Sequence, residues 1–390
     1  MTPHTLNFLF VGMLVSGLLT TAQPALAVPL NPASDDEIIE RLPAVNGNRA
    51  EERRARERLA QQPRDMSLAV ATAKRYLDQA HVLGDPRFAG MAMAALEGWK
   101  DEATMPDPVL MMRATLQQYL HEFDASAASL QRLLARPGEP RLQAWLTLAT
   151  VRRVQGRYAD SDAACKQVAR GGGSVHGNAC LAENAALRGD VARARAAFAA
   201  LLADRRQPAS TQAWLSTSVA EMEQRAGNVD AADAAYRAAL KLDADAYTTL
   251  AYADFLIDQK RPAQALALLK DQPRSDAVLL RLAIAGLQAG AASAASDATE
   301  MRERIALANE RPDAKVFHGR EQAMFALMVD RDPQRASALA RGNVAQQREP
   351  LDVLVLAQAA RASGEPTALQ DARRVVAETG LRDRRVEELL

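Results

Sequence analysis

The sequence predicts an all-α protein built as a solenoid of stacked antiparallel helix pairs. Three observations lead to this fold class. The 390-residue chain is 48% hydrophobic but only 4% aromatic, a composition that suits thin, repeated helix pairs better than one large core. Residues 211–243 contain two amphipathic helical patterns separated by Gly227 and Asn228. Similar turns then recur along most of the chain at intervals of 30 to 41 residues, which is the signature of a repeat architecture.

The first 27 residues are predicted to be a cleaved export signal. Residues 6–19 are mostly apolar, and residues 25–27 (Ala-Leu-Ala) give the small-x-small pattern of a cleavage site. No Lys or Arg precedes the apolar run, which departs from the usual signal pattern. An uncleaved anchor is the alternative. The run is, however, shorter than the ~20 residues that a membrane span needs. We therefore expect an exported, periplasmic protein with no stable membrane insertion once the signal is cleaved.

Two segments separate this signal from the repeats. Residues 28–48 contain several prolines and an acidic patch and are predicted to be an extended lead-in. Residues 49–65 are densely charged and contain Pro63 near their end, and we interpret them as a solvated capping helix. A basic binding arm is the alternative for this segment. From residue 66 to residue 390 the chain is predicted to be one solenoid.

Nine turns between helices divide this solenoid into about nine helix pairs. Six of the nine turn residues are glycine, which can adopt the left-handed conformation that ends a helix. In chain order the turn residues are Gly84, His121, Gly156, Gly189, Gly227, Lys260, Gly290, Arg331 and Gly364. Because one helix pair cannot bury its own apolar face, neighbouring pairs must stack.

The residues around these turns resemble the tetratricopeptide repeat (TPR) family. In residues 211–243, Ala220, Ala232 and Ala239 stand where two helices cross closely, and Tyr236 stands where a larger side chain fills the gap. Comparable matches occur in residues 145–158, 181–198, 252–269 and 282–295. The resemblance covers residue 66 to about residue 380. It implies a right-handed superhelix with a concave inner face lined by the first helix of each pair.

The chain has two cysteines, Cys165 and Cys180. The repeat register places them on neighbouring helices, so a disulfide between them would fit an oxidising compartment. Two buried thiols are the alternative. The sequence has no CxxC motif and no HExxH motif, and its five histidines are scattered, so no metal site is predicted.

The repeat register also brings polar and aromatic side chains together on the inner face. Glu183, Glu221 and Asp254 occupy the central position of three successive first helices. The other side chains predicted to face the groove are Arg153, Trp214, Thr217, Gln224 and Tyr247. We expect the carboxylates to supply charge and Trp214 and Tyr247 to act as anchors for an extended peptide or a basic group. A solvated helix face without a ligand is the alternative.

Together these features predict a non-catalytic exported scaffold or adaptor that binds a protein or peptide partner through its concave face. Local sequence marks no catalytic set of Ser, His and Asp or of Cys and His, and no cofactor is expected. The balance of 48 basic and 48 acidic residues argues against nucleic acid as a partner. The alternatives are a glycan-active enzyme of the cell envelope that uses a helical superstructure, and a self-associating structural component.

Overall fold

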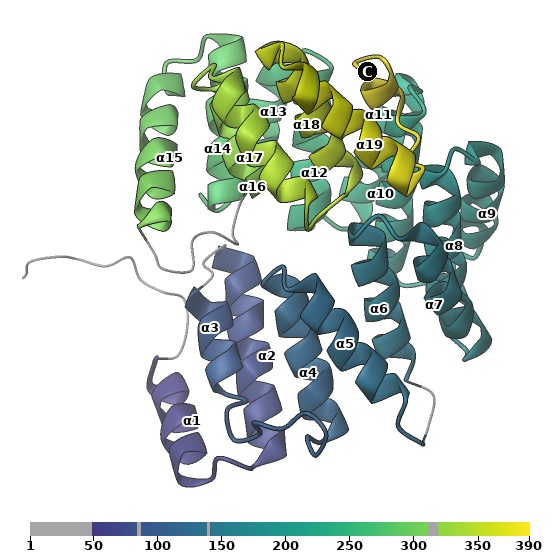
Figure 1. Cartoon of the computed structure of the whole chain (residues 1–390), viewed down its shortest axis with the longest axis vertical. Helices are drawn as coiled ribbons and strands as arrows, with labels where there is room; N and C mark the ends of the chain where they lie inside the picture. Colours follow the sequence, from purple (N-terminus) through teal and green to yellow (C-terminus); the bar gives the residue numbers. More distant parts are fainter. Residues whose placement is uncertain (1–48, 84–86, 139–140, 311–318) are drawn as a thin grey trace, which may run out of the picture. The chain divides into compact units, whose positions relative to one another are not determined.

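The computed structural model describes residues 49–83, 87–138, 141–310 and 319–390, and these residues form twenty α-helices and no strand (Figure 1). The predicted signal, the predicted lead-in and the turn residue Gly84 lie outside the described residues. None of the described helices combines the length and the hydropathy that a bilayer span requires.

The described helices form nine pairs between α1 (Arg49–Gln61) and the short α20 (Arg384–Glu387), in agreement with the predicted fold class. The first helices of the pairs are α2 (Met66–Leu83), α4 (Asp107–Tyr119), α6 (Leu142–Val154), α8 (Ser174–Leu187), α10 (Ala209–Arg225), α12 (Ala246–Asp258), α14 (Asp276–Ala289), α16 (Gly319–Met328) and α18 (Pro350–Ser363). The second helices are α3 (Arg87–Ala94), α5 (Phe123–Leu134), α7 (Tyr158–Arg170), α9 (Val191–Ala203), α11 (Val229–Leu242), α13 (Pro262–Leu269), α15 (Ala294–Asn309), α17 (Pro333–Val344) and α19 (Pro366–Thr379).

The predicted turn residues have left-handed backbone conformations. All eight that lie within the described residues have positive φ angles, including the three that carry a Cβ atom: His121 (60°), Lys260 (56°) and Arg331 (54°). At the glycine turn of residue 156, the amide of Gly156 donates to the carbonyl of Arg153 at 2.9 Å, and the next amide donates to the carbonyl of residue 152 at 2.8 Å. This pair of bonds is how a left-handed residue ends a helix. The predicted repeat register is therefore confirmed at these eight turns.

Small residues allow the paired helices to approach closely, and aromatic rings fill the space between pairs. Ala220, Ala232 and Ala239 are each 0% exposed. Tyr236 of α11 stacks on Tyr252 of α12, with 5.3 Å between the ring centroids. These residues are buried where the TPR pattern predicts, and each pair covers its apolar face by contact with its neighbour.

The charged helix α1 packs against α2 at the start of the described chain. Ala55 is 2% exposed, while most other side chains of α1 are exposed. The Arg75 guanidinium forms an ion pair with Glu51 at 3.5 Å, and the Gln79 side-chain amide donates to Glu52 at 2.6 Å. Helix α1 therefore buries one side on the first repeat and leaves its remaining charges in water.

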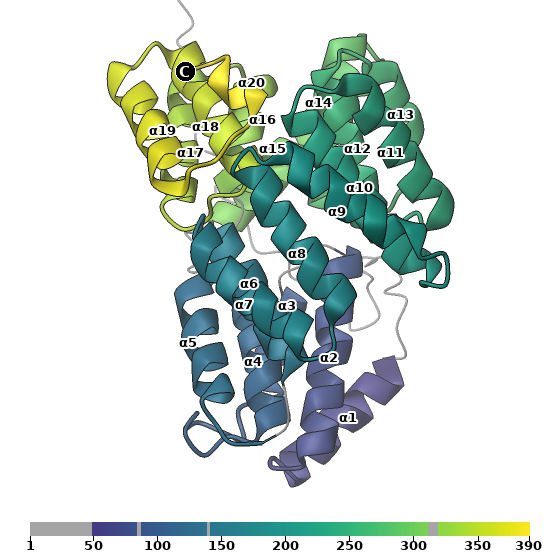
Figure 2. The same ribbon diagram turned by 90° about the vertical axis from the view of Figure 1, so that its right-hand side faces the viewer.

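The C-terminal part of the chain returns to the middle repeats, a contact that the repeat pattern does not predict (Figure 2). The amide of Arg348 donates to the carbonyl of Val154, at the end of α6, at 2.7 Å. The amide of Arg382 donates to the carbonyl of Leu187, at the end of α8, at 2.8 Å. The backbone of the last repeats is thus fixed to the ends of two first helices that lie far away in the sequence.

Side chains of residues 379–386, which we call the return segment, complete this contact. Arg385 forms an ion pair with Asp258, at the end of α12, at 3.2 Å. Leu381 and Val386 are each 1% exposed and share a hydrophobic core with Tyr236. A Cβ atom built on the turn glycine at position 156 would lie 2.4 Å from a methyl carbon of Thr379. The return segment therefore packs directly on the turn edge of the middle repeats.

Candidate functional site

The eight residues predicted to face the groove come from four successive first helices. Arg153 lies on α6 and Glu183 on α8, while α10 and α12 carry the other six. Contacts join α6 to α8, α8 to α10 and α10 to α12. We call the surface formed by the side chains of α6, α8, α10 and α12 the first-helix face.

A polar chain crosses three of these helices at the centre of the first-helix face. The Arg153 guanidinium forms an ion pair with the Oε2 atom of Glu183. The other carboxylate oxygen of Glu183, Oε1, accepts a hydrogen bond from the Ser218 hydroxyl of α10 at 2.7 Å. The side chains of Arg153 and Glu183 are 27% and 14% exposed. Burial lowers the pKa of Arg153, an effect opposed by nearby acidic groups that include Glu221. The carboxylate of Glu183 is therefore held and neutralised within the protein.

Asp254 is also paired inside the chain. Its Oδ2 atom accepts a hydrogen bond from the Arg281 guanidinium of α14 at 2.6 Å, and the two side chains are 16% and 7% exposed. Of the three carboxylates predicted to supply charge to a ligand, two thus have arginine partners that belong to the scaffold. Their main effect is to connect one repeat to the next.

Glu221 differs from the other two carboxylates. Within the described residues it has no ion pair, and its Oε1 atom accepts a hydrogen bond from the Tyr247 hydroxyl of α12 at 2.6 Å. The negative charge of Glu221, followed by burial, raises the pKa of Tyr247 well above its ordinary value. The Tyr247 side chain is nevertheless 63% exposed. Tyr247 is therefore the predicted anchor that remains exposed, and Glu221 is the partly buried carboxylate that holds it.

Two of the predicted groove residues are used in helix packing. Thr217 is 2% exposed, and its hydroxyl lies 2.8 Å from the Thr248 hydroxyl of α12. The Oε1 atom of Gln224 accepts a hydrogen bond from the Tyr236 hydroxyl at 2.9 Å. Thr217 and Gln224 hold α10 against its neighbours, so we do not place them among the residues that contact a ligand.

Trp214 lies beside a histidine that the sequence argument did not select. The ring of His176, on α8, stacks on the Trp214 ring with 5.4 Å between centroids and 20° between planes. His176 is exposed and Trp214 is partly buried. The signal that could have identified His176 is its register, because His176, Trp214 and Tyr247 each lie thirteen residues before the turn residue of their own repeat.

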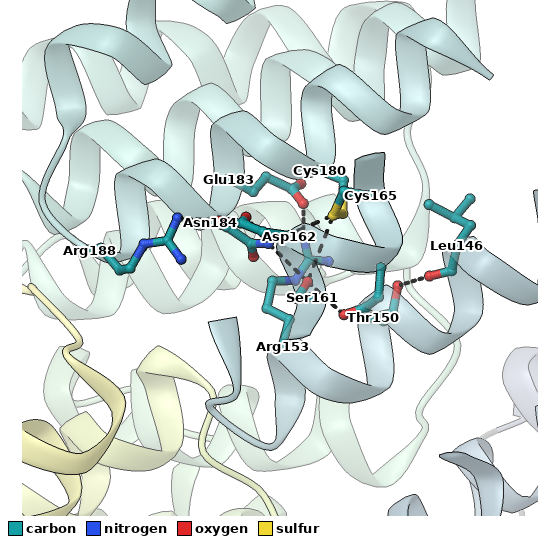
Figure 3. Close-up of a disulfide and its surroundings, with 11 residues drawn as sticks. Leu146, Thr150, Arg153, Ser161, Asp162, Cys165, Cys180, Glu183, Asn184 and Arg188 are labelled. Atoms are coloured by element: carbon teal, nitrogen blue, oxygen red, sulfur yellow. Dashed lines mark hydrogen bonds and ion pairs between the residues drawn. A yellow bond between two sulfur atoms is a disulfide. The ribbon is translucent and has the colours of Figure 1, made fainter. Parts of the chain in front are cut away.

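The two cysteines are bonded to each other in the structure, and the disulfide joins α7 to α8 (Figure 3). Their Cα atoms are 5.8 Å apart, and the side chains are 0% and 3% exposed. Asn184 donates to the Ser161 hydroxyl at 2.9 Å beside the bond. Cys180 lies on α8 one turn before Glu183, so the disulfide helps to fix the helix that carries the central polar chain.

The described residues show no arrangement for holding a metal ion, because no three His, Cys, Asp or Glu side chains among them are suitably grouped. Two scaffold partners, Ser218 and Arg281, were not among the residues predicted from the sequence. Both are common residue types on helix faces, and neither lies in a motif that a single sequence would reveal.

One solved structure, which aligns with a TM-score of 0.50, supports the fold. A Rap protein complexed with competence and sporulation factor covers 88% of this chain and 93% of its own length, with a TM-score of 0.50 and 10% sequence identity. Yeast Tom70 covers 87% of this chain and 82% of its own, with a TM-score of 0.39 and 13% identity. The TPR domain of P58(IPK) covers 84% of this chain and 93% of its own, with a TM-score of 0.20 and 12% identity. No family model and no curated protein matches the sequence. The fold is a TPR-like solenoid.

Proposed function

We propose that this TPR-like protein is a non-catalytic adaptor of the periplasm that binds a protein or peptide partner through its first-helix face. The observation that carries the proposal is the pair formed by Glu221 and Tyr247, in which a carboxylate that has no ion pair with any described residue holds a tyrosine that is 63% exposed. Exposed aromatic side chains held in one orientation are typical anchors of protein interfaces.

The surroundings of this pair favour recognition of a partner by a rigid surface. The bonds from Arg153 to Glu183 and from Glu183 to Ser218 fix three first helices relative to one another. A surface that is already ordered loses little conformational entropy when a partner binds. The scaffold bonds therefore support binding at Tyr247 even though they remove Glu183 from direct recognition.

The proposed compartment rests on two features of the chain. Residues 1–27 have the apolar run and small-x-small ending of an export signal. The bond between Cys165 and Cys180 is of the kind that persists in oxidising compartments. Cell fractionation followed by N-terminal sequencing checks this part of the proposal, since we expect the protein in the periplasmic fraction with Val28 as its first residue. A cytosolic protein that begins at Met1 would contradict it.

Site-specific photo-crosslinking in living cells tests the binding face. A photoreactive amino acid placed at position 247 is expected to capture one discrete partner. The same group at Arg237, whose side chain is 59% exposed on the second helix α11, serves as the control and is expected to capture none. Equal capture at both positions, or none at position 247, would overturn the proposal. Light scattering of the purified protein shows whether the captured partner is a second copy of the chain.

A charge-removing variant tests the role assigned to Glu221. We expect Glu221→Gln to weaken capture at position 247 by about tenfold, because an accessible anchor group at an interface contributes on the order of 1.4 kcal/mol. The matched control is Asp230→Asn, which removes an exposed carboxylate from α11. Circular dichroism should show the same helix content in both variants. Unchanged capture by Glu221→Gln would remove this residue from the site.

A further inference from the structure

Residues 381–390, which we call the latch, follow α19 and lie against the turns of the middle repeats. A Cβ atom built on the turn glycine Gly189 would lie 3.0 Å from the Cγ atom of Arg382. One built on Gly227, the turn glycine of the next repeat, would lie 2.7 Å from the Cδ atom of Arg384. The ion pair of the return segment with α12 extends this contact to a third repeat. The latch therefore crosses three successive repeats at their turn edge.

Carboxylates outnumber arginines in the cluster that joins the latch to α12. Arg385 lies between two carboxylates, because its Nη2 atom pairs with Asp383 of the latch at 2.7 Å and its Nη1 atom pairs with Asp258 at 3.2 Å. A third carboxylate, Asp254, lies one turn before Asp258 on α12 and pairs with Arg281 of α14 at 2.6 Å. Three carboxylates thus share two arginines, and one negative charge of the cluster has no arginine to neutralise it.

Asp258 is the carboxylate of this cluster that takes up a proton most readily. Asp383 accepts two hydrogen bonds from the Arg385 guanidinium, at 2.7 and 3.1 Å, and one from the Arg385 amide at 3.0 Å. Asp258 accepts a single bond from that guanidinium, at 3.2 Å. Burial raises the pKa of Asp258 to about 6, against the opposing charges of Arg385 and Lys260 and with the added effect of Asp254.

A proton on Asp258 favours the closed latch. In water an aspartate has a pKa of about 4, and opening of the latch returns Asp258 to water. A group whose pKa is higher in the closed form stabilises that form fully below about pH 4, and the contribution is lost as the pH rises through about 6. Tyr236 of α11 also faces Arg385. Burial raises the pKa of Tyr236 well above its ordinary value, so Tyr236 stays neutral over this range.

Opening of the latch does not require any repeat to unfold. Gly380, which precedes the latch, has a φ angle of 69°, and a Cβ atom added there would meet no atom within 4 Å. The chain can therefore rotate at this residue. Opening removes Leu381 and Val386 from the core and breaks the bond from Arg373 of α19 to the Leu390 carbonyl, but the helix within the latch, α20, has only four residues. Such short segments beside a larger folded unit open at a low cost in free energy.

We propose that the latch is a proton-linked device that opens from the turns of the middle repeats as the pH rises, while the helix pairs stay folded. Opening uncovers the Leu187 carbonyl at the end of α8 and the Asp258 carboxylate at the end of α12, together with the apolar side chains that Leu381 and Val386 cover. The protein then presents a surface near neutral pH that is covered in acid. This inference goes beyond the proposed function and does not depend on a partner at the first-helix face.

Hydrogen exchange of single amides in the purified, disulfide-bonded protein tests the inference. The Arg382 amide reports on the latch because it donates to the Leu187 carbonyl at 2.8 Å. The Asp190 amide donates to the Ala185 carbonyl at 2.9 Å and reports on the repeat beneath the latch. After correction for the intrinsic exchange rate, protection of the Arg382 amide is expected to fall roughly 50-fold between pH 4 and pH 7, as a change in pKa from about 6 to about 4 requires.

The comparison of the two amides shows whether the latch opens by itself. Protection of the Arg382 amide is expected to be at least about tenfold lower than protection of the Asp190 amide at each pH, because opening of the latch costs less free energy than unfolding of the repeat. Equal protection of the two amides would mean that the latch and the repeat open together, and this result would overturn the inference. Protection of the Arg382 amide that does not fall as the pH rises would also overturn it.

A variant that does not titrate connects the pH dependence to Asp258. Asp258→Asn retains an oxygen that can accept a hydrogen bond from Arg385, and it is expected to abolish most of the fall in protection of the Arg382 amide. The matched control is Asp78→Asn, because Asp78 lies in an exposed pair with Lys74 on α2; this variant should show the full fall. Circular dichroism should show the same helix content in both variants. A fall of the same size in Asp258→Asn and Asp78→Asn would overturn the inference.

Discussion

At the scale of single residues, three residues with a side chain adopt the left-handed backbone conformation that is adopted by glycine at the other turns. His121, Lys260 and Arg331 have φ angles of 60°, 56° and 54°. The left-handed conformation costs a residue with a Cβ atom roughly 1–2 kcal/mol. The surrounding helix pairs maintain it there because a different turn would move one helix out of register with its neighbour.

Replacement of one of these residues by glycine should stabilise the protein. Arg331 is exposed, so its side chain contributes little packing. We expect Arg331→Gly to raise the free energy of unfolding by about 0.5–1 kcal/mol, since relief of the left-handed conformation exceeds the greater flexibility of glycine in the unfolded chain. Urea denaturation measures the change. Arg331→Ala keeps the Cβ atom and should give no gain; a gain of the same size in both variants would contradict this explanation.

Removal of one partner from a buried ion pair should have a much larger effect than removal of an exposed one. Asp254→Ala leaves Arg281, whose side chain is 7% exposed, without its carboxylate, and we expect a loss of about 2–4 kcal/mol in the free energy of unfolding. The control is Asp78→Ala, which breaks the exposed pair with Lys74 and should cost less than about 1 kcal/mol. Similar losses in the two variants would show that Arg281 finds another partner or reaches water.

At the scale of elements, the disulfide fixes the contact between α7 and α8. The two cysteines are 15 residues apart in the sequence. Closing a loop of this length removes conformational freedom from the unfolded chain and adds about 3 kcal/mol of stability. We expect the Cys165→Ala/Cys180→Ala double variant to lose about 2–3 kcal/mol and to become insensitive to reducing agents. Chemical denaturation with and without reductant measures both effects. A reductant effect that persists in the double variant would mean that the bond is not its cause.

The elements themselves could be predicted well because a repeat is a local pattern. The spacing of turns alone identified His121, Lys260 and Arg331 as turn residues although none is glycine, and each has the predicted conformation. The same register placed Tyr236 and Ala220 in the core, where both are buried. Helix periodicity and turn chemistry act over a few residues, so a single sequence contains enough information to locate them.

The candidate site could be predicted only in part. The register placed Glu183, Glu221 and Asp254 on successive first helices, but it could not show that Arg153 and Arg281 neutralise two of them. Ion pairing between repeats depends on side-chain conformations and on residues 27 to 30 positions away. Periodicity along the chain does not determine which of several nearby charges will meet.

At the scale of the whole molecule, the ion pair between Arg385 and Asp258 connects the return segment to α12. Burial, together with the nearby charge of Asp254, raises the pKa of Asp258 to about 6, against the opposing effect of Arg385. A carboxyl group whose pKa is higher in the folded chain than in the unfolded chain stabilises the fold most at low pH. This contribution is fully present below about pH 4 and is lost as the pH rises through about 6.

We therefore expect the free energy of unfolding to decrease between about pH 4 and pH 6 in the unmodified protein. Asp258→Asn should show a smaller decrease over the same range, because its side chain does not titrate. Urea denaturation at a series of pH values measures the two slopes. Burial also raises the pKa of Asp352, to about 7, so the difference between the two proteins isolates Asp258. Parallel slopes would contradict the assignment.

Two turn glycines with similar φ angles provide a test of the return contact. The φ angle is 74° at Gly156 and 66° at Gly290. A Cβ atom added at Gly156 would lie 2.4 Å from a methyl carbon of Thr379, whereas one added at Gly290 would meet no atom within 4 Å. We expect Gly290→Ala to cost about 1 kcal/mol for the backbone conformation alone and Gly156→Ala to cost about 1–3 kcal/mol more for the collision. Equal costs, measured by urea denaturation, would indicate that Thr379 does not pack on this turn.

The return segment has a consequence for how the protein acquires its final form. An open array of repeats can fold progressively, since each unit needs only the unit beside it. Here Arg385 pairs with a residue 127 positions earlier, and contacts between such distant parts of a chain slow folding. The middle repeats leave the ribosome long before their last partners do. The contacts that cover the ends of α6, α8 and α12 therefore form only once the C-terminal repeats are in place, and until then these helix ends stay uncovered.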